Sequence, residues 1–525
     1  MGDPYDRLPG DNHLISGPGG RQTNPRQYDG DFFCAYGFGP WGFGAKPGFT
    51  VRTMPLATYR EKATQHLDFP AGLKYNPGMA DLIEPRLLKG FRDFLPQAET
   101  VRRCLTEKIE STFRSFGFVP IDTPALEYAD ILLGKGGGET EKQIYRFKDN
   151  GGRDVALRFD LTVPFARFVA QHQAELCFPL KRYHIGKVWR GENAQRGRYR
   201  EFTQCDFDII GSDSPAADFE ILLMIRTVLS NLGAGVDIKI NHRGLFNRFL
   251  SHIGRREKSA EILRAVDKVA KVGIAETGTT LAEIAGDADA GKILEFTGVS
   301  GDAANKDFET TLARMTEMSG GPSPESERLA MLGRFMRDTL CDGESGFFTL
   351  DPSITRGLDY YTGVVFETFL TELPDIGSVC SGGRYDNLAG LYSKTAISGV
   401  GSSVGLDRLI AALESLGGLP GGTGLAPVAI ACLRQEDSGS YQALARRFRD
   451  AGLACEVFTD AAESGGGKAP VKQFVLAEKK GLRWMVVPGE KPSHDTFTLR
   501  DLAARKNMDG LSVQDAVKTI LGERQ

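Results

Sequence analysis

The pattern of apolar and polar residues changes character several times along the chain. From about Pro85, apolar residues recur at helical spacing near Ala98 to Phe116, and the next stretch, FVPIDTPALEYADIL, has two prolines around a short extended piece. IYRFKD and DVALRFDL then alternate apolar and polar residues on either side of Asn150-Gly151-Gly152, which predicts an antiparallel hairpin. A longer pair of alternating segments follows in residues 181–211. The pattern therefore predicts an antiparallel sheet.

Helical spacing dominates the middle of the chain, and strands return after it. The region from about Leu245 to Ser345 is mostly amphipathic, which indicates a helical insertion. RGLDYYTGVVFETF, Arg356 to Phe369, resumes the sheet, and Ser398 to Leu413 is typical of a glycine-rich strand that runs into a helix. After the linker-like LGGLPGGTGLAP, a β-α-β-α-β order predicts a separate small α/β domain.

These changes divide the chain into parts. We expect an N-terminal extension at 1–84, a sheet domain at 85–240 and 346–416, a helical insertion at 241–345, a linker at 417–426 and a C-terminal α/β domain at 427–525. The extension contains FFCAYGFGPWGFGAKPGFT, which has no helical or strand period, so we expect little regular structure there. The extension contains several aspartates, whereas transit peptides are poor in acidic residues. Met79 is an alternative start of translation, which leaves open whether the extension is translated.

Composition narrows the class of protein. The 525 residues have ordinary globular fractions of apolar and charged residues, and the net charge of −4 gives no general basic field, so any nucleic-acid contact must come from local patches. Eight cysteines without a CxxC pair and seven histidines without HExxH suggest neither a zinc site nor a disulfide framework. These features predict a reducing compartment, and the lack of an apolar run near 18 residues predicts no membrane span.

Arginines gather at the tip of the long hairpin. Arg190 lies near the end of the first strand, Arg198 and Arg200 open the return strand on one face, and Glu192 lies between them. Guanidinium groups bind phosphate oxygens in pairs, so this pattern suits a polyphosphate, although a solvated basic tip is the alternative. The first strand contains the sequence HIGK. It lacks the surrounding strands and helices of a doubly wound nucleotide-binding fold, so we expect His184 to have a structural role.

Two further elements carry arginines beside glycines. Arg356 stands with Tyr361 at the mouth of a predicted strand, and Arg408 opens a helix after a glycine-rich strand. Three arginine-bearing elements in one sheet domain favour a phosphate site more strongly than any one of them alone.

At this point the motifs carry a resemblance to a known family. FVPIDTPALEYADIL, VWRGENAQRGRYREFTQCDFDI and VGSSVGLDRL resemble motifs 1, 2 and 3 of the class II aminoacyl-tRNA synthetases. RGLDYYTG and SGGRYDNL are similar to the two signatures that distinguish the histidyl-tRNA synthetases within that class. The resemblance implies an α+β class II catalytic domain built on an antiparallel sheet, with a helical insertion and a C-terminal α/β anticodon-binding domain.

The resemblance also implies roles for single residues in a histidine–tRNA ligase, which activates histidine with ATP and transfers it to the 3′ end of tRNA(His). Catalytic and ATP-binding positions are Arg356, Arg190, Glu192, Arg198 and Arg408. Histidine-binding positions are Asp160, Thr162, Gln204, Asp208, Arg356, Tyr361 and Tyr385. Asp160 and Asp208 stand where many bacterial members have Glu, so each shorter acid must lie closer to the ligand or act through water.

The implied partners follow from the same resemblance. Mg²⁺ would be held mainly by ATP, with no dedicated protein metal site. The C-terminal domain would contact the anticodon and the loop Asn193–Arg196 the acceptor end, while motif 1, near Pro124, would form a homodimer in the cytoplasm. Two alternatives remain: a non-catalytic regulatory paralogue of ATP phosphoribosyltransferase, and a class II synthetase for another amino acid such as threonine or proline.

Overall fold

The computed structural model describes most of the chain from residue 83 onward. The described ranges are 83–134, 139–193, 195–298, 307–340, 347–355, 361–386, 390, 392, 396–418, 428–461, 469–489 and 496–522. The extension predicted at 1–84 and the linker predicted at 417–426 lie almost wholly outside them.

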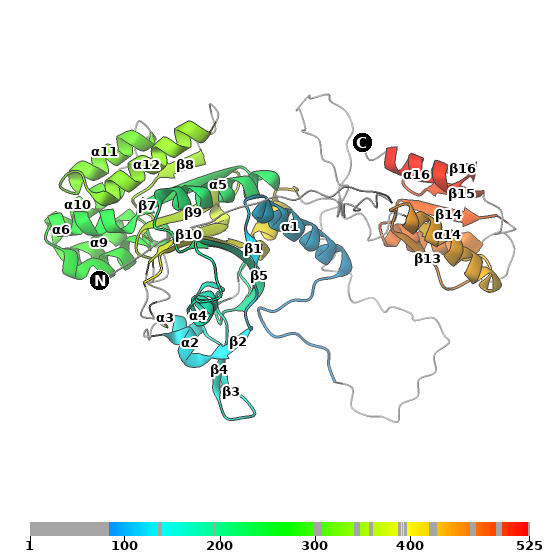
Figure 1. Cartoon of the computed structure of the whole chain (residues 1–525), viewed down its shortest axis with the longest axis horizontal. Coiled ribbons are helices and arrows are strands. Elements are labelled where there is room, and N and C mark those ends of the chain that lie inside the picture. The colour runs from blue at the N-terminus through cyan, green and yellow to red at the C-terminus, as the bar shows by residue number, and fades with distance from the viewer. Residues whose placement is uncertain are drawn as a thin grey trace, which may run out of the picture. The chain divides into compact units, whose positions relative to one another are not determined.

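An eight-stranded sheet forms the region that the sequence predicts to be a sheet domain (Figure 1). Its strand order is β1-β5-β6-β11-β10-β9-β7-β8, with parallel pairs only at the two ends, β1–β5 and β7–β8. The predicted antiparallel sheet is therefore confirmed. The strand bounds are β1 Val119–Pro120, β5 Leu180–Trp189, β6 Glu201–Ile210, β7 Val236–His242, β8 Phe348–Leu350, β9 Val364–Leu370, β10 Cys380–Tyr385 and β11 Gly399–Gly405.

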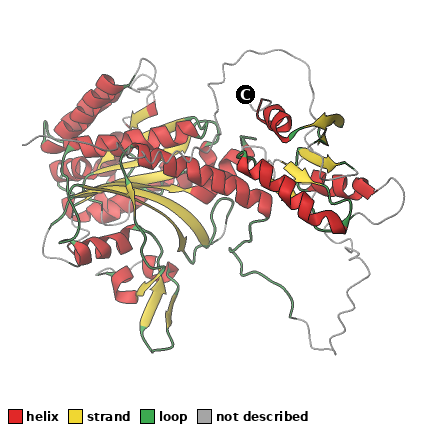
Figure 2. Cartoon of the chain, turned by 45° about the vertical axis from the view of Figure 1, so that its right-hand side comes forward, coloured by secondary structure: helices red, strands yellow, loops and turns green. Residues whose placement is uncertain are grey.

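Helices α1 (Pro96–Ser115) and α5 (Pro215–Asn231) cover one face of this sheet (Figure 2). Phe113 of α1 packs on Tyr183 of β5 and Phe207 of β6, with ring centroids 5.5 and 4.9 Å apart. Because side chains alternate between the faces of a strand, every second residue of β6 joins this apolar layer and the residues between them point to the opposite face. The opposite face is where the polar residues of β6 lie.

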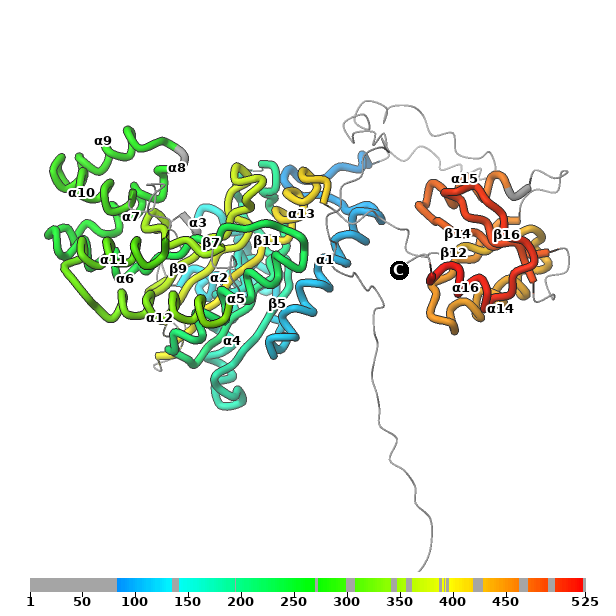
Figure 3. The backbone as a smooth tube through the Cα atoms, turned by 90° about the horizontal axis from the view of Figure 1, so that it is seen from above, coloured from blue at the N-terminus to red at the C-terminus, as the bar shows by residue number. Residues whose placement is uncertain are grey.

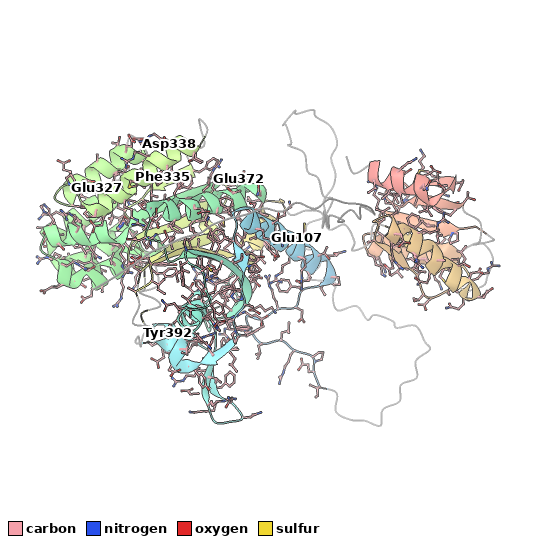
Figure 4. All side chains as sticks on the ribbon, viewed as in Figure 1. Glu107, Glu327, Phe335, Asp338, Glu372 and Tyr392 are labelled. Atoms are coloured by element: carbon pink, nitrogen blue, oxygen red, sulfur yellow. The ribbon has the colours of Figure 1, made fainter. Side chains whose placement is uncertain are left out.

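A smaller sheet stands beside the large one, and it confirms the short predicted hairpin. Its strands run in the order β2-β4-β3, with the turn at Asn150 between β3 and β4. Tyr392, labelled in Figure 4, ties a later segment to this part by donating its hydroxyl to the carbonyl of Ile131 at 2.8 Å. The bounds are β2 Leu126–Tyr128, α2 Ala129–Leu133, α3 Glu139–Gln143, β3 Arg146–Lys148, β4 Asp154–Leu157 and α4 Thr162–His172.

The predicted insertion is helical (Figure 3), and its apolar side chains join the core of the eight-stranded sheet. Its last helix begins sharply because Ser323 caps the amide of Ser326 and Pro324 occupies the first turn. Phe335 of that helix packs on Phe219 of α5, with ring centroids 5.8 Å apart. The helices are α6 Arg243–His252, α7 Ser259–Val266, α8 Val269–Val272, α9 Ile274–Ala285, α10 Asp287–Gly298, α11 Phe308–Met318 and α12 Pro324–Thr339.

The C-terminal part has its own five-stranded sheet, in the order β13-β12-β14-β15-β16. The first three strands are parallel and confirm the predicted β-α-β-α-β order, whereas the antiparallel β15 and β16 were not predicted. No helix among the described residues is long and apolar enough to cross a bilayer. The elements are β12 Val428–Ile430, α14 Ser438–Asp450, β13 Cys455–Val457, α15 Ala469–Lys479, β14 Trp484–Pro488, β15 Phe497–Asp501, β16 Lys506–Leu511 and α16 Val513–Gly522.

Candidate active site

A cavity of about 760 Å³ lies on the polar side of the eight-stranded sheet. Ten of the eleven residues selected from the sequence line it: Asp160, Thr162, Arg190, Glu192, Arg198, Gln204, Asp208, Tyr361, Tyr385 and Arg408. The eleventh, Arg356, lies outside the described residues. Residues separated by up to about 250 positions in sequence thus share one hollow.

The β6–β11 ladder explains how two of these residues reach the cavity. Gln204 and Asp208 are four residues apart on β6, so they point to the same face. Their partners in the ladder are Gly405 and Gly401 of β11, which have no side chains to fill the space above them. The glycine-rich strand therefore forms the floor of the cavity.

Asp208 is held firmly at one end of the cavity. The hydroxyl of Tyr385 donates to its Oδ1 at 2.5 Å, and Arg182 of β5 brings Nη2 to 2.6 Å from its Oδ2. Burial raises the pKa of Asp208, while Arg182 and the Tyr385 hydroxyl lower it. The short carboxylate is therefore fixed by neighbouring side chains, which is how this chain places an acid that is one methylene shorter than Glu.

Tyr361 and Tyr385 form an aromatic wall beside Asp208. Both rings belong to a small cluster that packs on Ala166 of α4. Burial raises the pKa of Tyr385 well above its usual value, so its hydroxyl keeps its proton and acts as a donor. This wall offers a flat apolar surface with a hydrogen-bonding tip.

Asp160 and Gln204 place two acceptor atoms in the same cavity. Asp160 precedes α4 and accepts the amide of Val163 through Oδ1 at 3.1 Å, whereas its Oδ2 has no hydrogen-bond partner among the described residues. Gln204 donates through Nε2 to Ser403 at 2.9 Å, and within the described ranges its Oε1 is also without a partner. Buried acceptors without donors are costly, so this end of the cavity fits a cationic donor such as an ammonium group.

Burial also raises the pKa of Asp160. Its pKa is raised to about 6 by loss of contact with water, against the partial compensation of Arg190 and Arg182. The carboxylate is therefore ionised near neutral pH, but at a cost that a bound cation would offset.

The other end of the cavity is lined by arginines. Arg190 donates through Nε to the carbonyl of Phe159 at 2.9 Å, and its guanidinium lies 5.2 Å from the ring centroid of Phe202. Glu192 lies between two of the arginines, 3.9 Å from Arg190 and 3.4 Å from Arg198. An aromatic face next to guanidinium groups suits a nucleotide, because the base can stack and the phosphates can pair with charge.

Arg198 and Arg408 extend this basic end into a neighbouring cavity of about 620 Å³ that they also line. Nη1 of Arg408 donates to the carbonyl of Ser378 at 2.5 Å, which anchors the side chain to the segment just before β10. The backbone at Gly197 approaches Arg408 so closely that a Cβ there would be 3.3 Å from its side chain. The hairpin tip and the first turn of α13 (Leu406–Ser415) therefore meet.

Two details of the predicted hairpin are wrong. Arg190 follows the last residue of β5, and Arg198 and Arg200 precede β6, so all three lie in the connecting loop rather than on strands. Gln195 and Arg198 form an isolated bridge there, which narrows the loop over the cavity. His184, by contrast, is buried in the middle of β5, as expected of a structural histidine.

Sequence reasoning missed other residues at this site. Phe202 and Glu367 line the cavity, and Arg182 lies directly behind Asp208. The signal for Arg182 was available, because it alternates with His184 on the inner face of β5, where a strand in a sheet core is normally apolar.

The chain resembles known proteins along most of its length. The family model described as histidyl-tRNA synthetase matches residues 90–409. A histidine–tRNA ligase of Treponema denticola is 52% identical over 453 residues, covering 84% of this chain and 99% of that protein. The histidine–tRNA ligase of Rhodopirellula baltica is 47% identical, and the match covers 82% of this chain and 96% of that protein.

Solved structures agree with this placement. The histidyl-tRNA synthetase of Nostoc sp. PCC 7120 has a TM-score of 0.74 and 27% identity, and covers 84% of this chain and 100% of its own. A Bacillus halodurans protein described as an ATP phosphoribosyltransferase regulatory subunit/histidyl-tRNA synthetase, at 21% identity and a TM-score of 0.62, shares the fold. With the family model matched over more than half of its residues, this chain belongs to the histidyl-tRNA synthetase family.

Proposed function

We propose that this chain is a histidine–tRNA ligase, which activates L-histidine with ATP to histidyl-adenylate and transfers the histidyl group to the 3′ end of tRNA(His). The observation that carries this proposal is one cavity with an acidic, aromatic end and an arginine-lined end. An amino acid and a triphosphate bound there would meet between the two ends.

We assign the acidic end to histidine. The ammonium group would be held by Asp160, Thr162 and Gln204. This assignment suits the acceptor oxygens of Asp160 and Gln204 that have no partner among the described residues. Asp208, Tyr361 and Tyr385 would enclose the imidazole. An amino acid whose side chain does not match the polar atoms of this pocket would bury a mismatched polar group, at about 1–3 kcal/mol each, which gives selectivity.

We assign the basic end to ATP. The histidine carboxylate attacks the α-phosphorus, a bond forms between the carboxylate oxygen and that phosphorus, and pyrophosphate leaves with the electron pair of the broken P–O bond. A carboxylate is already a nucleophile at neutral pH, so the protein has to position the reactants and neutralise charge. Arg190 would act on the α-phosphate, Arg198 and Arg408 on the outer phosphates, and Glu192 at the adenine edge. Arg356 keeps its proposed role at the α-phosphate and the substrate carboxylate from the sequence motif alone.

Magnesium fits the basic end as part of the ATP complex. Glu367 is buried and lines the cavity with Arg198 and Arg408, so it offers one carboxylate next to the expected phosphates. Among the described residues no group of three or more metal-ligating side chains is placed to hold an ion. When bound, Mg²⁺ would neutralise phosphate charge, and phosphate oxygens would supply most of its ligands.

The remaining assignments concern partners and place. We propose a homodimer formed through motif 1, where Val119, Leu126 and Tyr128 expose 48%, 40% and 53% of their surfaces, and sedimentation velocity tests it. The loop Asn193–Arg196 and the C-terminal domain are the proposed tRNA contacts, with the domain bounds given above. Cytoplasmic location is proposed because the cysteines in the described ranges are free thiols.

Histidine-dependent exchange of pyrophosphate into ATP tests the function. We expect exchange with histidine and none with threonine or proline. Histidine binding without exchange would favour the regulatory paralogue of ATP phosphoribosyltransferase, and exchange driven by another amino acid would favour a different class II synthetase.

Gly401→Ala tests the floor of the histidine pocket. A Cβ at this position would clash with Oδ1 of Asp208, which Arg182 and Tyr385 hold in place. We expect the KM for histidine in the exchange assay to rise at least about tenfold, with a loss of about 1–3 kcal/mol in stability from overpacking. Gly439→Ala in α14 is the control, because no atom lies within 4 Å of its added Cβ. An unchanged KM for histidine in Gly401→Ala would contradict the assignment of Asp208 to the histidine pocket.

A further inference from the structure

Arg182 is a fully buried cation that does not itself line the cavity. It lies in the middle of β5, directly opposite Asp208 in the β5–β6 ladder, and none of its surface is exposed. Its Nη2 lies 2.6 Å from Oδ2 of Asp208, and its guanidinium carbon lies 4.0 Å from the ring centroid of Phe165 in α4. The side chain is therefore clamped between the sheet and α4, behind the histidine pocket.

Three buried acids surround this guanidinium. Asp160, Asp206 and Asp208 are each 2% exposed, and Asp206 and Asp208 lie on the same face of β6. Burial raises the pKa of Asp160 to about 6 and that of Asp206 to about 7, and it raises the pKa of Asp208 as well. Arg182 lowers the pKa of all three. It is thus a positive charge that acts on all three carboxylates, while Arg190 has the larger effect on Asp160.

The other titratable groups around the cluster do not replace Arg182. They include Arg158, His184, Arg190 and Tyr385. Tyr392 beside Asp160, and Cys205 and Cys380 beside Asp206, keep their protons because burial raises the pKa of each. His184 is neutral, because burial, aided by Arg182 and Arg158, lowers its pKa to about 3. Tyr385 keeps its proton, Arg190 acts on Asp160, and Arg158 interacts with Asp206.

We propose that Arg182 is a positioning residue for amino-acid recognition: it fixes the Asp208 carboxylate against Tyr385 and supplies the buried positive charge that this carboxylate faces while the cavity is empty. This inference rests on the function proposed above and goes beyond it, because it explains how an unoccupied, buried pocket keeps the negative charge that attracts an ammonium group. Because the pKa of Asp206 is about 7, this acid is only partly ionised at neutral pH, and the negative charge beside the guanidinium comes mainly from Asp160 and Asp208. The bound amino acid would neutralise that charge.

Loss of the guanidinium is expected to raise the pKa of the three acids. Without Arg182 the three acids would hold their protons to higher pH, and a protonated acid no longer attracts an ammonium group. As the pH falls, histidine binding should therefore be lost at a higher pH in the variant than in the unchanged protein. The titration of the substrate imidazole is the same for every variant, so a shift between variants reports on the protein.

The experiment compares three full-length variants with the unchanged protein. Arg182→Met removes the charge, Arg182→Lys keeps the charge and loses the planar fork, and Arg167→Met is the matched control. Arg167 also forms a partly buried ion pair, with Glu127 at 2.5 Å. The measured quantities are the pH profile of kcat/KM for histidine in pyrophosphate exchange, the KM for ATP and the Tm.

For Arg182→Met we expect the acid limb of kcat/KM to move up by about one pH unit or more. The KM for histidine at pH 7 should rise about tenfold, with a smaller change in the KM for ATP. Arg182→Lys should keep the limb near its original pH, and Arg167→Met should lower Tm without moving the limb.

Two results would overturn the inference. One is an Arg182→Met protein whose limb coincides with that of the unchanged protein. The other, which decides the matter even if Arg182→Met does not fold, is an Arg182→Lys protein whose limb moves up by a full unit. Failure of the proposed function is distinguishable from both, because the unchanged protein would then show no histidine-dependent exchange at any pH.

Discussion

Replacing Arg190 with alanine is expected to lower the kcat of histidine-dependent pyrophosphate exchange by about a thousandfold. Arginines aimed at a transferring phosphoryl group contribute on the order of 10³-fold or more, because they neutralise charge that develops in the transition state. The Nε hydrogen bond to Phe159 and the neighbouring Phe202 ring fix the guanidinium before substrate binds. The KM for ATP should change far less, because Arg198 and Arg408 line the cavity for the outer phosphates.

Two companion variants sharpen this experiment. Arg190→Lys keeps the charge but loses the fork and the Nε contact, so it should recover only part of the rate. Arg103→Ala removes an arginine of α1 whose side chain is 80% exposed, and it should match the unchanged protein. A kcat within tenfold of normal in Arg190→Ala would show that this residue does not act on the reacting phosphate.

Replacing Asp160 with asparagine is expected to raise the KM for histidine about a hundredfold while making the ligand-free protein more stable. Removing one partner of a buried charge pair costs about 2–5 kcal/mol in binding. Asn retains an oxygen that can accept the amide of Val163, so the start of α4 should persist. The same carboxylate would thus bind the substrate and lower the stability of the ligand-free protein.

The gain in stability has a pH window. Burial raises the pKa of Asp160 from 3.8 to about 6, so the protonated form favours the folded state. That contribution is complete below about pH 3.8 and is lost as the pH rises through 6, which leaves a cost of at most about 3 kcal/mol at pH 8. Thermal unfolding should show a higher Tm for Asp160→Asn at pH 8 and no difference near pH 4.

Asp450→Asn, at an exposed position of α14, serves as the control and should change neither Tm nor KM. An Asp160→Asn protein with normal KM for histidine would contradict the assignment of the ammonium group. A lower Tm at pH 8 would contradict the cost of burying this carboxylate.

Local patterns predicted the catalytic sheet well because they depend on neighbouring residues. The alternation in β5 and β6 gives both the strands and the face on which Gln204 and Asp208 lie. The β15–β16 hairpin was missed because β16, KNMDGL, is almost wholly exposed and has no apolar alternation to mark it. Strands held mainly by ladder hydrogen bonds leave little trace in a sequence.

The candidate site was predictable as a set of motifs but not as a network. The arginines of the hairpin tip and of α13 were found from residue type and spacing. Sequence could not show that Arg182 meets Asp208 in the interior, because that depends on strand register and on burial. The raised pKa of Asp160 likewise depends on desolvation by surrounding segments, which no short motif encodes.

A crystal structure of the full chain with histidine and a non-hydrolysable ATP analogue tests the central claim most directly. We expect the histidine ammonium within about 3.2 Å of Asp160 and Gln204, the imidazole beside Asp208 and Tyr385, and the phosphates against Arg190, Arg198 and Arg408. Histidine bound elsewhere, or a triphosphate that does not contact these arginines, would contradict the account.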